Sequence, residues 1–219
     1  MVGDEFRRLD MTMMFAVHNA FRRDLDHLLR VTEQPDDDPA AVLRAAVGWE
    51  MFKGNLHVHH TAEDAALWPA VTSAVEGRSG DLALLVAMEA EHAVIDPLLA
   101  LVDATLADRE TGPERLGGAV DALSTALRGH LRHEEHDALP LIDDVLPEAD
   151  FQRFGEAHRE RVGTGLPRYM PWMLEGAPEE TTTRILSVMP PQLLAAYESE
   201  WRPAYRSLEL WPNEKASPR

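Results

Sequence analysis

The chain has 219 residues, with 38 acidic and 21 basic side chains, ten histidines, no cysteine and a formal net charge of −17. This balance excludes a nucleic-acid-binding body and a polybasic membrane contact, because both need clustered Lys and Arg. The lack of cysteine excludes disulfides, thiolate nucleophiles and Cys-ligated metal sites, so any metal must be held by histidine and carboxylate. No apolar run approaches the roughly 20 residues that span a bilayer, and the polar N-terminus does not resemble a signal peptide. A cytoplasmic location is therefore expected.

Helical periodicity dominates the first two thirds of the chain, where apolar residues recur at i, i+3 and i+4 spacing. Asp38 is a good N-cap and Pro39 a good first helical residue, so the second helix is expected to begin there. Four long helices are predicted, over residues 10–32, 39–76, 81–107 and 111–145. Their length and short connections predict an all-α fold, an up-down-up-down four-helix bundle within residues 1–147.

Residues 148–219 differ in composition, because proline, glycine and large aromatic residues become frequent. Shorter helices are expected around residues 150–162, 179–188 and 191–208. So many aromatic side chains would not stay exposed on a loose tail. This segment is therefore predicted to form a helical extension packed on the bundle.

The histidines are unusually often followed by an acid four residues later, a spacing that places both side chains on one helix face. Chance placement would give about 1.7 such pairs. The chain has five: His59/Glu63, His60/Asp64, His92/Asp96, His130/Glu134 and His133/Asp137.

Two of these clusters form an internal repeat. The segment His59-His-Thr-Ala-Glu-Asp-Ala-Ala-Leu-Trp-Pro69 aligns without a gap with His130-Leu-Arg-His-Glu-Glu-His-Asp-Ala-Leu-Pro140, 130 − 59 = 71 residues later. In each, a histidine, an acidic doublet and a proline coincide. Two such helices in a bundle could each give an imidazole and a carboxylate to one dinuclear metal site.

Helical-wheel positions then select the side chains that face the core. His18, His92 and His130 lie on the apolar stripes of their helices, as do Glu63 and Glu134, and Asp96 lies one turn beyond His92. His59 and His60 straddle the stripe of the second helix, and the repeat favours His59. Four further residues are expected on the surface: His27, His158, Glu89 and Glu91. The other members of these clusters are expected on a solvated face or beside the ligands: His57, His60, His133, His136, Asp64, Glu135 and Asp137.

The alternative is that these are ordinary structural residues, since a single histidine on an apolar face is more often a hydrogen-bonded core residue than a ligand. The joint pattern argues against this alternative, because burying so many unpaired polar groups would cost several kcal/mol each. A charged centre in the core would satisfy them together.

The segments His18-Asn-Ala-Phe-Arg-Arg-Asp-Leu25, His59 to Pro69, Glu91-His92 and His130-Leu-Arg-His-Glu-Glu135 resemble the hemerythrin-like, or HHE cation-binding, domain over about residues 10–147. The resemblance implies a four-helix bundle with two non-haem iron ions, carboxylate bridges and an oxygen-derived bridge; manganese is the second choice. It carries His18, His59, Glu63, His92, His130 and Glu134 into the ligand set. In oxygen-carrying members a second histidine stands where this chain has Asp96, and a more anionic ligand set would favour oxidation over reversible oxygen release.

Two functions compete. The first is a di-iron protein that binds, senses or stores dioxygen, peroxide, nitric oxide or iron. The second is a di-iron oxidase, oxygenase or peroxide-decomposing enzyme, with the aromatic extension covering a substrate pocket. A partner-binding helical protein with incidental histidines ranks third. Whether Asp96 is a ligand, and whether His59 or His60 is, stays open at this point.

Overall fold

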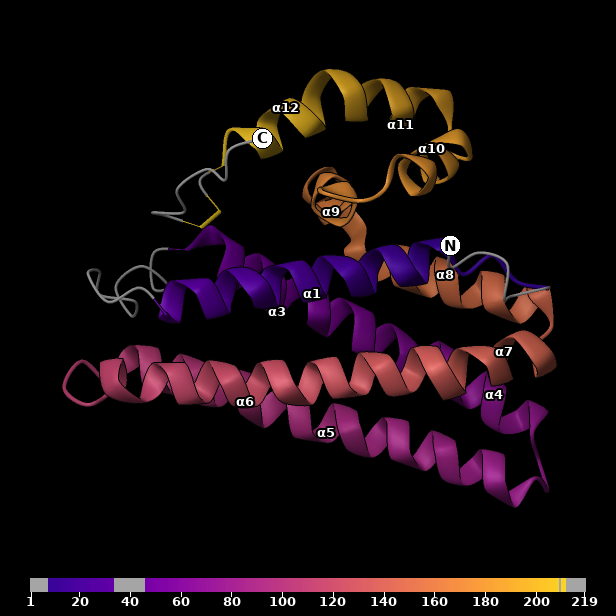
Figure 1. Cartoon of the computed structure of the whole chain (residues 1–219). Coiled ribbons are helices and arrows are strands. Elements are labelled where there is room, and N and C mark those ends of the chain that lie inside the picture. The colour runs from indigo at the N-terminus through magenta and orange to yellow at the C-terminus, as the bar shows by residue number, and fades with distance from the viewer. Residues whose placement is uncertain (1–7, 34–45, 209, 212–219) are drawn as a thin grey trace.

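The computed structural model describes residues 8–33, 46–208 and 210–211, and every regular element within these ranges is helical. The predicted four-helix bundle is confirmed, with consecutive stretches running in opposite directions (Figure 1). Its elements are α1 (Thr12–Thr32), α3 (Val47–Ala62) followed by α4 (Trp68–Ala74), α5 (Ser79–Ala107), and α6 (Gly112–His133) followed by α7 (Leu139–Val145). The predicted helix start at Asp38 and Pro39 lies outside the described residues. Among the helices that are described, none is both long and apolar enough to cross a membrane.

Two of the bundle's four stretches are interrupted by a single π-helical turn, where the sequence predicted continuous α-helix. Glu63–Leu67 joins α3 to α4, and Glu134–Ala138 joins α6 to α7. In each turn the first residue, a glutamate, accepts a hydrogen bond from the backbone N–H five residues later. Such turns widen the helix locally and are frequent at functional sites.

The prolines of the internal repeat explain these turns. Pro69 and Pro140 each stand two residues after a π turn, so the carbonyl four residues before the proline lies inside the turn. Proline has no N–H for that carbonyl, and its ring displaces it. A third π turn, Tyr197–Trp201, precedes Pro203 in the same way.

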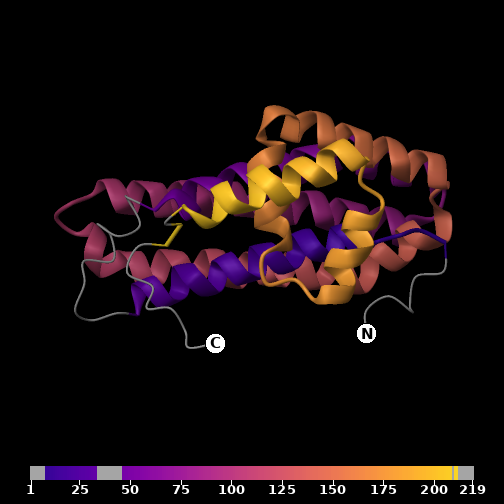
Figure 2. The same ribbon diagram turned by 90° about the horizontal axis from the view of Figure 1, so that it is seen from above.

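The C-terminal segment folds into short helices on one side of the bundle (Figure 2). They are α8 (Glu148–Val162), α9 (Leu166–Leu174), α10 (Glu179–Ser187), α11 (Pro191–Ala196) and α12 (Arg202–Arg206). Helix α9 was not among the predicted helices, and it contains two prolines, Pro167 and Pro171. Pro167 lies in the first turn, where no N–H is needed, and burial of α9 outweighs the backbone hydrogen bond that Pro171 cannot make.

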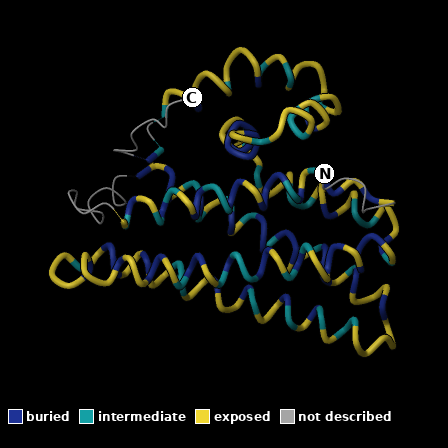
Figure 3. Tube along the Cα trace, viewed as in Figure 1, coloured by how far each residue is buried: buried dark blue, intermediate teal, exposed yellow. Residues whose placement is uncertain are grey.

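The extension and the bundle share one apolar core. Helix α9 lies between α1 and the layer formed by α11 and α12, and its last six residues, Tyr169 to Leu174, are buried (Figure 3). Trp172 on α9 packs on Phe21 of α1 with ring centroids 5.2 Å apart, and Phe21 in turn contacts Phe52 of α3. Large buried side chains therefore connect the extension to the centre of the bundle.

A polar anchor fixes α9 on α1. Asp24 is buried and accepts hydrogen bonds from Trp172 Nε1 at 2.7 Å and from the Arg23 guanidinium, and Arg23 also donates to the carbonyls of Trp172 and Glu175. Burial raises the pKa of Asp24, although Arg23 and Trp172 act in the opposite direction. The carboxylate thus serves as the acceptor at the centre of this joint.

Replacing Asp24 with alanine is expected to lower the free energy of unfolding by about 1–3 kcal/mol, because Trp172 Nε1 loses its buried acceptor. The raised pKa means that the folded protein binds this proton more tightly than the unfolded chain, so wild type gains stability relative to the variant as pH falls from 7 toward 3.8. Urea unfolding at several pH values measures both effects. Asp26→Ala, which removes an exposed partner of Arg128, should change stability by no more than about 1 kcal/mol; equal losses for the two variants would contradict the anchor.

Candidate metal centre

Two adjoining groups of metal-ligating side chains lie in the middle of the bundle. The histidine–glutamate group contains His18, His59, Glu63 and Glu134, and the three-histidine group contains His60, His92 and His130. Within each group the ligand atoms all lie within 4.8 Å of one another, and all seven residues are buried. Helix α1, the α3–α4 stretch, α5 and the α6–α7 stretch each contribute, so the site depends on the assembled bundle.

The two glutamates connect the groups. Glu63 has Oε1 at 3.2 Å from His59 Nε2 and Oε2 at 3.5 Å from His92 Nε2. Glu134 Oε2 lies 3.3 Å from His18 Nε2 and 3.8 Å from His130 Nε2. Each carboxylate therefore faces one histidine of each group, which is the placement that a bridging ligand needs.

Unpartnered buried atoms mark the space between these residues. Both carboxylate oxygens of Glu63, both of Glu134 and Nε2 of His60 are buried without a hydrogen-bond partner. An unsatisfied buried carboxylate costs more than other polar groups, and natural proteins seldom keep one without a compensating charge. Nitrogen and oxygen donors in this number suit iron or manganese, so the donor set fits a pair of such cations.

The electrostatics of the centre also favour positive charge. Burial lowers the pKa of His18, but the carboxylates of Glu134 and Glu135 outweigh burial and raise the pKa to about 9. Burial and neighbouring histidines hold the pKa of His59 and of His60 well below 6.5, so these imidazoles are neutral and free to ligate. Burial together with the charge of Glu134 raises the pKa of Glu63 well above its usual value.

A second layer of carboxylates orients the histidines. The Nδ1–H of His18 donates to Glu135, that of His92 to Asp64 and that of His130 to Glu91, each at 2.9 Å. These bonds leave Nε2 of each ring directed at the centre, and they make the imidazole a better ligand. The two acids of each doublet in the repeat therefore have different positions. The first acid faces the centre, and the second accepts a hydrogen bond from a histidine of another helix.

Glu91 offers a test of this layer, because it also accepts from His133 Nδ1 at 2.7 Å. Glu91→Gln is expected to weaken metal binding by about 10–100-fold while the fold is kept, since outer hydrogen bonds of this kind have effects of that size. Competition with a chelator measures the affinity. Glu89→Gln, at an exposed position on the same helix, serves as the control, and an unchanged affinity in Glu91→Gln would rule out an orienting role.

The structure brings together six of the seven side chains that the sequence selected: His18, His59, Glu63, His92, His130 and Glu134. Asp96 is exposed and belongs to neither group, because Ile95, one residue earlier, takes the core-facing position of α5. His60, which the sequence placed on the surface or beside the ligands, is buried, and its ring stacks on that of His92 with centroids 4.0 Å apart. His59 and His60 therefore both face the centre, each in a different group.

Two further expectations about the surface are corrected. Glu91 is half-buried against His130, and His158 of α8 packs its ring 6.2 Å from that of His59. The position of Glu91 could have been predicted, because Glu91 precedes His92 on α5, and the core face of α5 lies against the histidines of α6. For His158 no local signal existed, since its contact depends on how the extension folds back.

Comparison with known proteins agrees with this geometry. Residues 10–142 match the Hemerythrin HHE cation binding domain. No curated protein and no solved structure matches the chain. The match covers more than half of the chain and contains both ligand groups, so the chain belongs to the hemerythrin HHE cation-binding domain family.

Proposed function

We propose that this chain is a non-haem di-iron protein that binds or reacts with dioxygen, peroxide or nitric oxide. The observation that carries the proposal is the pair of ligand groups joined by Glu63 and Glu134. A pair of iron ions held there would exchange two electrons with a small oxidant. A single catalytic zinc ion is a poorer fit, because it commonly uses three protein ligands, whereas seven ligand-bearing side chains converge here.

The protein's own contribution is to position the ligands and to keep water out. The ring of Phe21 lies 5.5 Å from His59, and that of Trp68 lies 6.3 Å from His92. Both rings are fully buried, so the centre is covered by apolar side chains next to His59 and next to His92. Small uncharged molecules could enter such a site more readily than ions, because an ion would have to shed its hydration shell.

A second candidate function is a di-iron oxidase, oxygenase or peroxide-decomposing enzyme. One observation favours it: His59 forms part of the wall of a pocket that opens between α1 and the extension. A substrate bound in that pocket would lie against a residue of the metal centre. In both functions a small oxidant reaches the metal centre. In the binding function it is held there, and in the enzymatic function it is consumed in a reaction.

One experiment separates these outcomes. The iron-loaded protein is reduced without oxygen and then exposed in turn to dioxygen, hydrogen peroxide and nitric oxide while its optical spectrum is recorded. A spectral change with dioxygen that reverses when the gas is removed supports binding, and continued peroxide consumption supports an enzyme. Iron-loaded protein with no spectral response to any of the three would contradict the proposal.

A further inference from the structure

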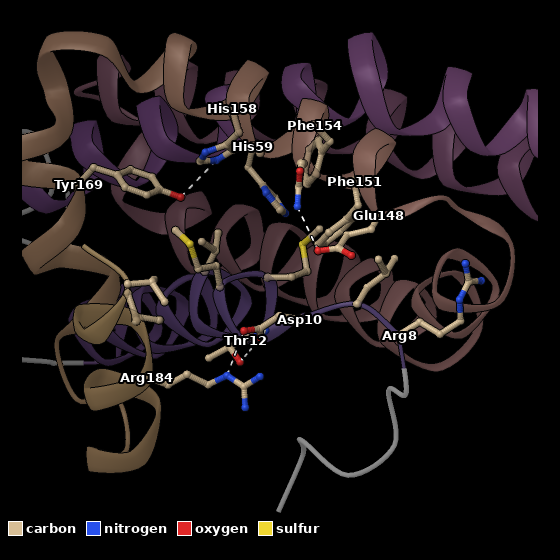
Figure 4. A pocket seen from close by; sticks show the side chains of 18 residues that line it. Arg8, Asp10, Thr12, His59, Glu148, Phe151, Phe154, His158, Tyr169 and Arg184 are labelled. Carbon is tan, nitrogen blue, oxygen red and sulfur yellow. Dashed lines mark hydrogen bonds and ion pairs between the residues drawn. The ribbon is translucent and has the colours of Figure 1, made fainter. Parts of the chain in front are cut away.

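A pocket of about 350 Å³ lies where the beginning of α1 meets α8, α9 and α10 (Figure 4). Its volume falls within the range of about 300–1,000 Å³ that small-molecule sites occupy. Much of its wall comes from residues 148–188, beyond the part of the chain that matches the family. The extension therefore builds a cavity that the bundle alone would not have.

The lining divides into an apolar floor and one polar corner. The floor consists of buried side chains from three helices: Met14, Val17, Phe154 and Ile185. The polar corner contains His59, His158 and Tyr169, which Figure 4 shows close together on one side of the pocket. The Tyr169 hydroxyl and His158 Nε2 form a hydrogen bond at 3.2 Å, and the hydroxyl oxygen can still accept from a bound molecule.

The charged residues of the lining balance and already have partners. Two are basic, Arg8 and Arg184, and two are acidic, Asp10 and Glu148. Arg184 pairs with Asp10 at 3.0 Å, and Glu148 accepts from Gln152 at 3.1 Å. Arg8 donates to main-chain carbonyls, including that of Asp143 at 3.0 Å. The lining therefore carries no excess of either charge that would select a charged ligand.

We propose that this pocket binds a small, uncharged and mostly apolar organic molecule, with its polar group directed at His158 and Tyr169. The apolar floor accounts for the body of the ligand, and the hydrogen-bonded pair accounts for its single polar end. A ligand in this position contacts the ring of His59, one of the residues of the metal centre. That the ligand would meet a reactive metal rests on the proposed function, but binding itself does not.

Two fluorescent probes test the proposal on the full chain, both as loaded with iron and after metal removal. N-phenyl-1-naphthylamine is uncharged, and 8-anilinonaphthalene-1-sulfonate has the same ring skeleton with an added sulfonate. The uncharged probe is expected to bind saturably, with one site per chain, and the sulfonate roughly tenfold or more weakly, because it introduces an unpaired charge. Absence of saturable binding of the uncharged probe, or tighter binding of the sulfonate, would overturn the proposal.

Glycine positions allow the pocket to be filled with little disturbance. Gly155 lines the pocket, and a Cβ there would have no neighbour within 4 Å. Gly155→Leu is expected to weaken binding of the uncharged probe by roughly tenfold or more. The control is Gly118→Leu on α6, which is equally open and distant in sequence from every lining residue, and its binding should be unchanged.

A second pair of variants keeps the test valid if Gly155→Leu fails to fold. Val188→Trp changes an exposed residue at the rim, and Val86→Trp changes an exposed residue of α5 outside the lining. The rim variant alone should slow or weaken binding. Unaltered probe binding in both Gly155→Leu and Val188→Trp would place the probe elsewhere and refute the proposal. If the proposed function is wrong but the pocket proposal is right, the wild-type protein does not bind iron, and the metal-free protein still binds the uncharged probe.

Discussion

Glu63→Met is expected to abolish tight metal binding and, at the same time, to stabilise the metal-free protein by about 1–3 kcal/mol. Glu63 is fully buried, and neither of its carboxylate oxygens has a hydrogen-bond partner. Methionine fills a similar volume without a polar group to desolvate. Glu63 faces a histidine of each group, so if it holds metal as proposed, its removal should lower the metal content sharply.

The two halves of this result are measured separately. Urea unfolding of the metal-free proteins gives the change in stability, and elemental analysis gives the metal content. Glu160→Met, at an exposed position on α8, controls for the side-chain exchange and should alter stability by less than about 0.5 kcal/mol. A variant that keeps its metal would show that Glu63 is not a ligand, and one that is destabilised when metal-free would show that Glu63 has a structural role.

His60→Leu is expected to weaken metal binding at the three-histidine group by at least about 100-fold, since loss of a mere outer hydrogen bond already has effects of about 10–100-fold. His60 is buried, its Nε2 has no hydrogen-bond partner, and its ring stacks on His92. Leucine preserves the apolar packing, so the variant should fold. Titration of the metal-free protein with ferrous iron against a chelator measures the affinity of each site.

The matched control is His57→Leu, one turn earlier on α3 at an exposed position. It should bind iron as wild type does. Equal affinity in the His60 and His57 variants would mean that the stacked histidine only fills space, and the second ion would then have to be held by His92 and His130 with the carboxylates alone.

The fold was predictable from the sequence because helical periodicity is a local property. Four amphipathic stretches with short links leave few arrangements other than a bundle. The π turns were not foreseen, although the prolines that accompany them were visible in the repeat. Their effect depends on whether a helix breaks or widens at Pro69 and Pro140, and tertiary packing decides between these outcomes.

The location of the site was predictable, because one core-facing histidine on each bundle helix was enough to place it. His60 was ranked below His59 because the helical wheel selects one centre line, whereas the two ligand groups are reached from adjacent positions about 100° apart. Asp96 was included because its i+4 spacing from His92 suggested a shared face. Ile95 competes for the same face and is nearly fully buried, so the apolar residue faces the core.

A pocket covered by the extension was expected for the enzymatic function, but most of its lining could not be predicted, because it is made by contacts between distant parts of the chain. His158 and Tyr169 are separated from His59 by about half of the sequence, yet they line one cavity with it. No periodic pattern indicates such a contact. Only the way in which α8 and α9 pack against the bundle brings these residues together.

The most direct test of the central claim is the metal content of the wild-type protein after expression with abundant iron. The two ligand groups predict two iron ions per chain, retained through removal of loosely bound metal. Iron well below two per chain, or a single tightly bound zinc ion in its place, would contradict the dinuclear centre.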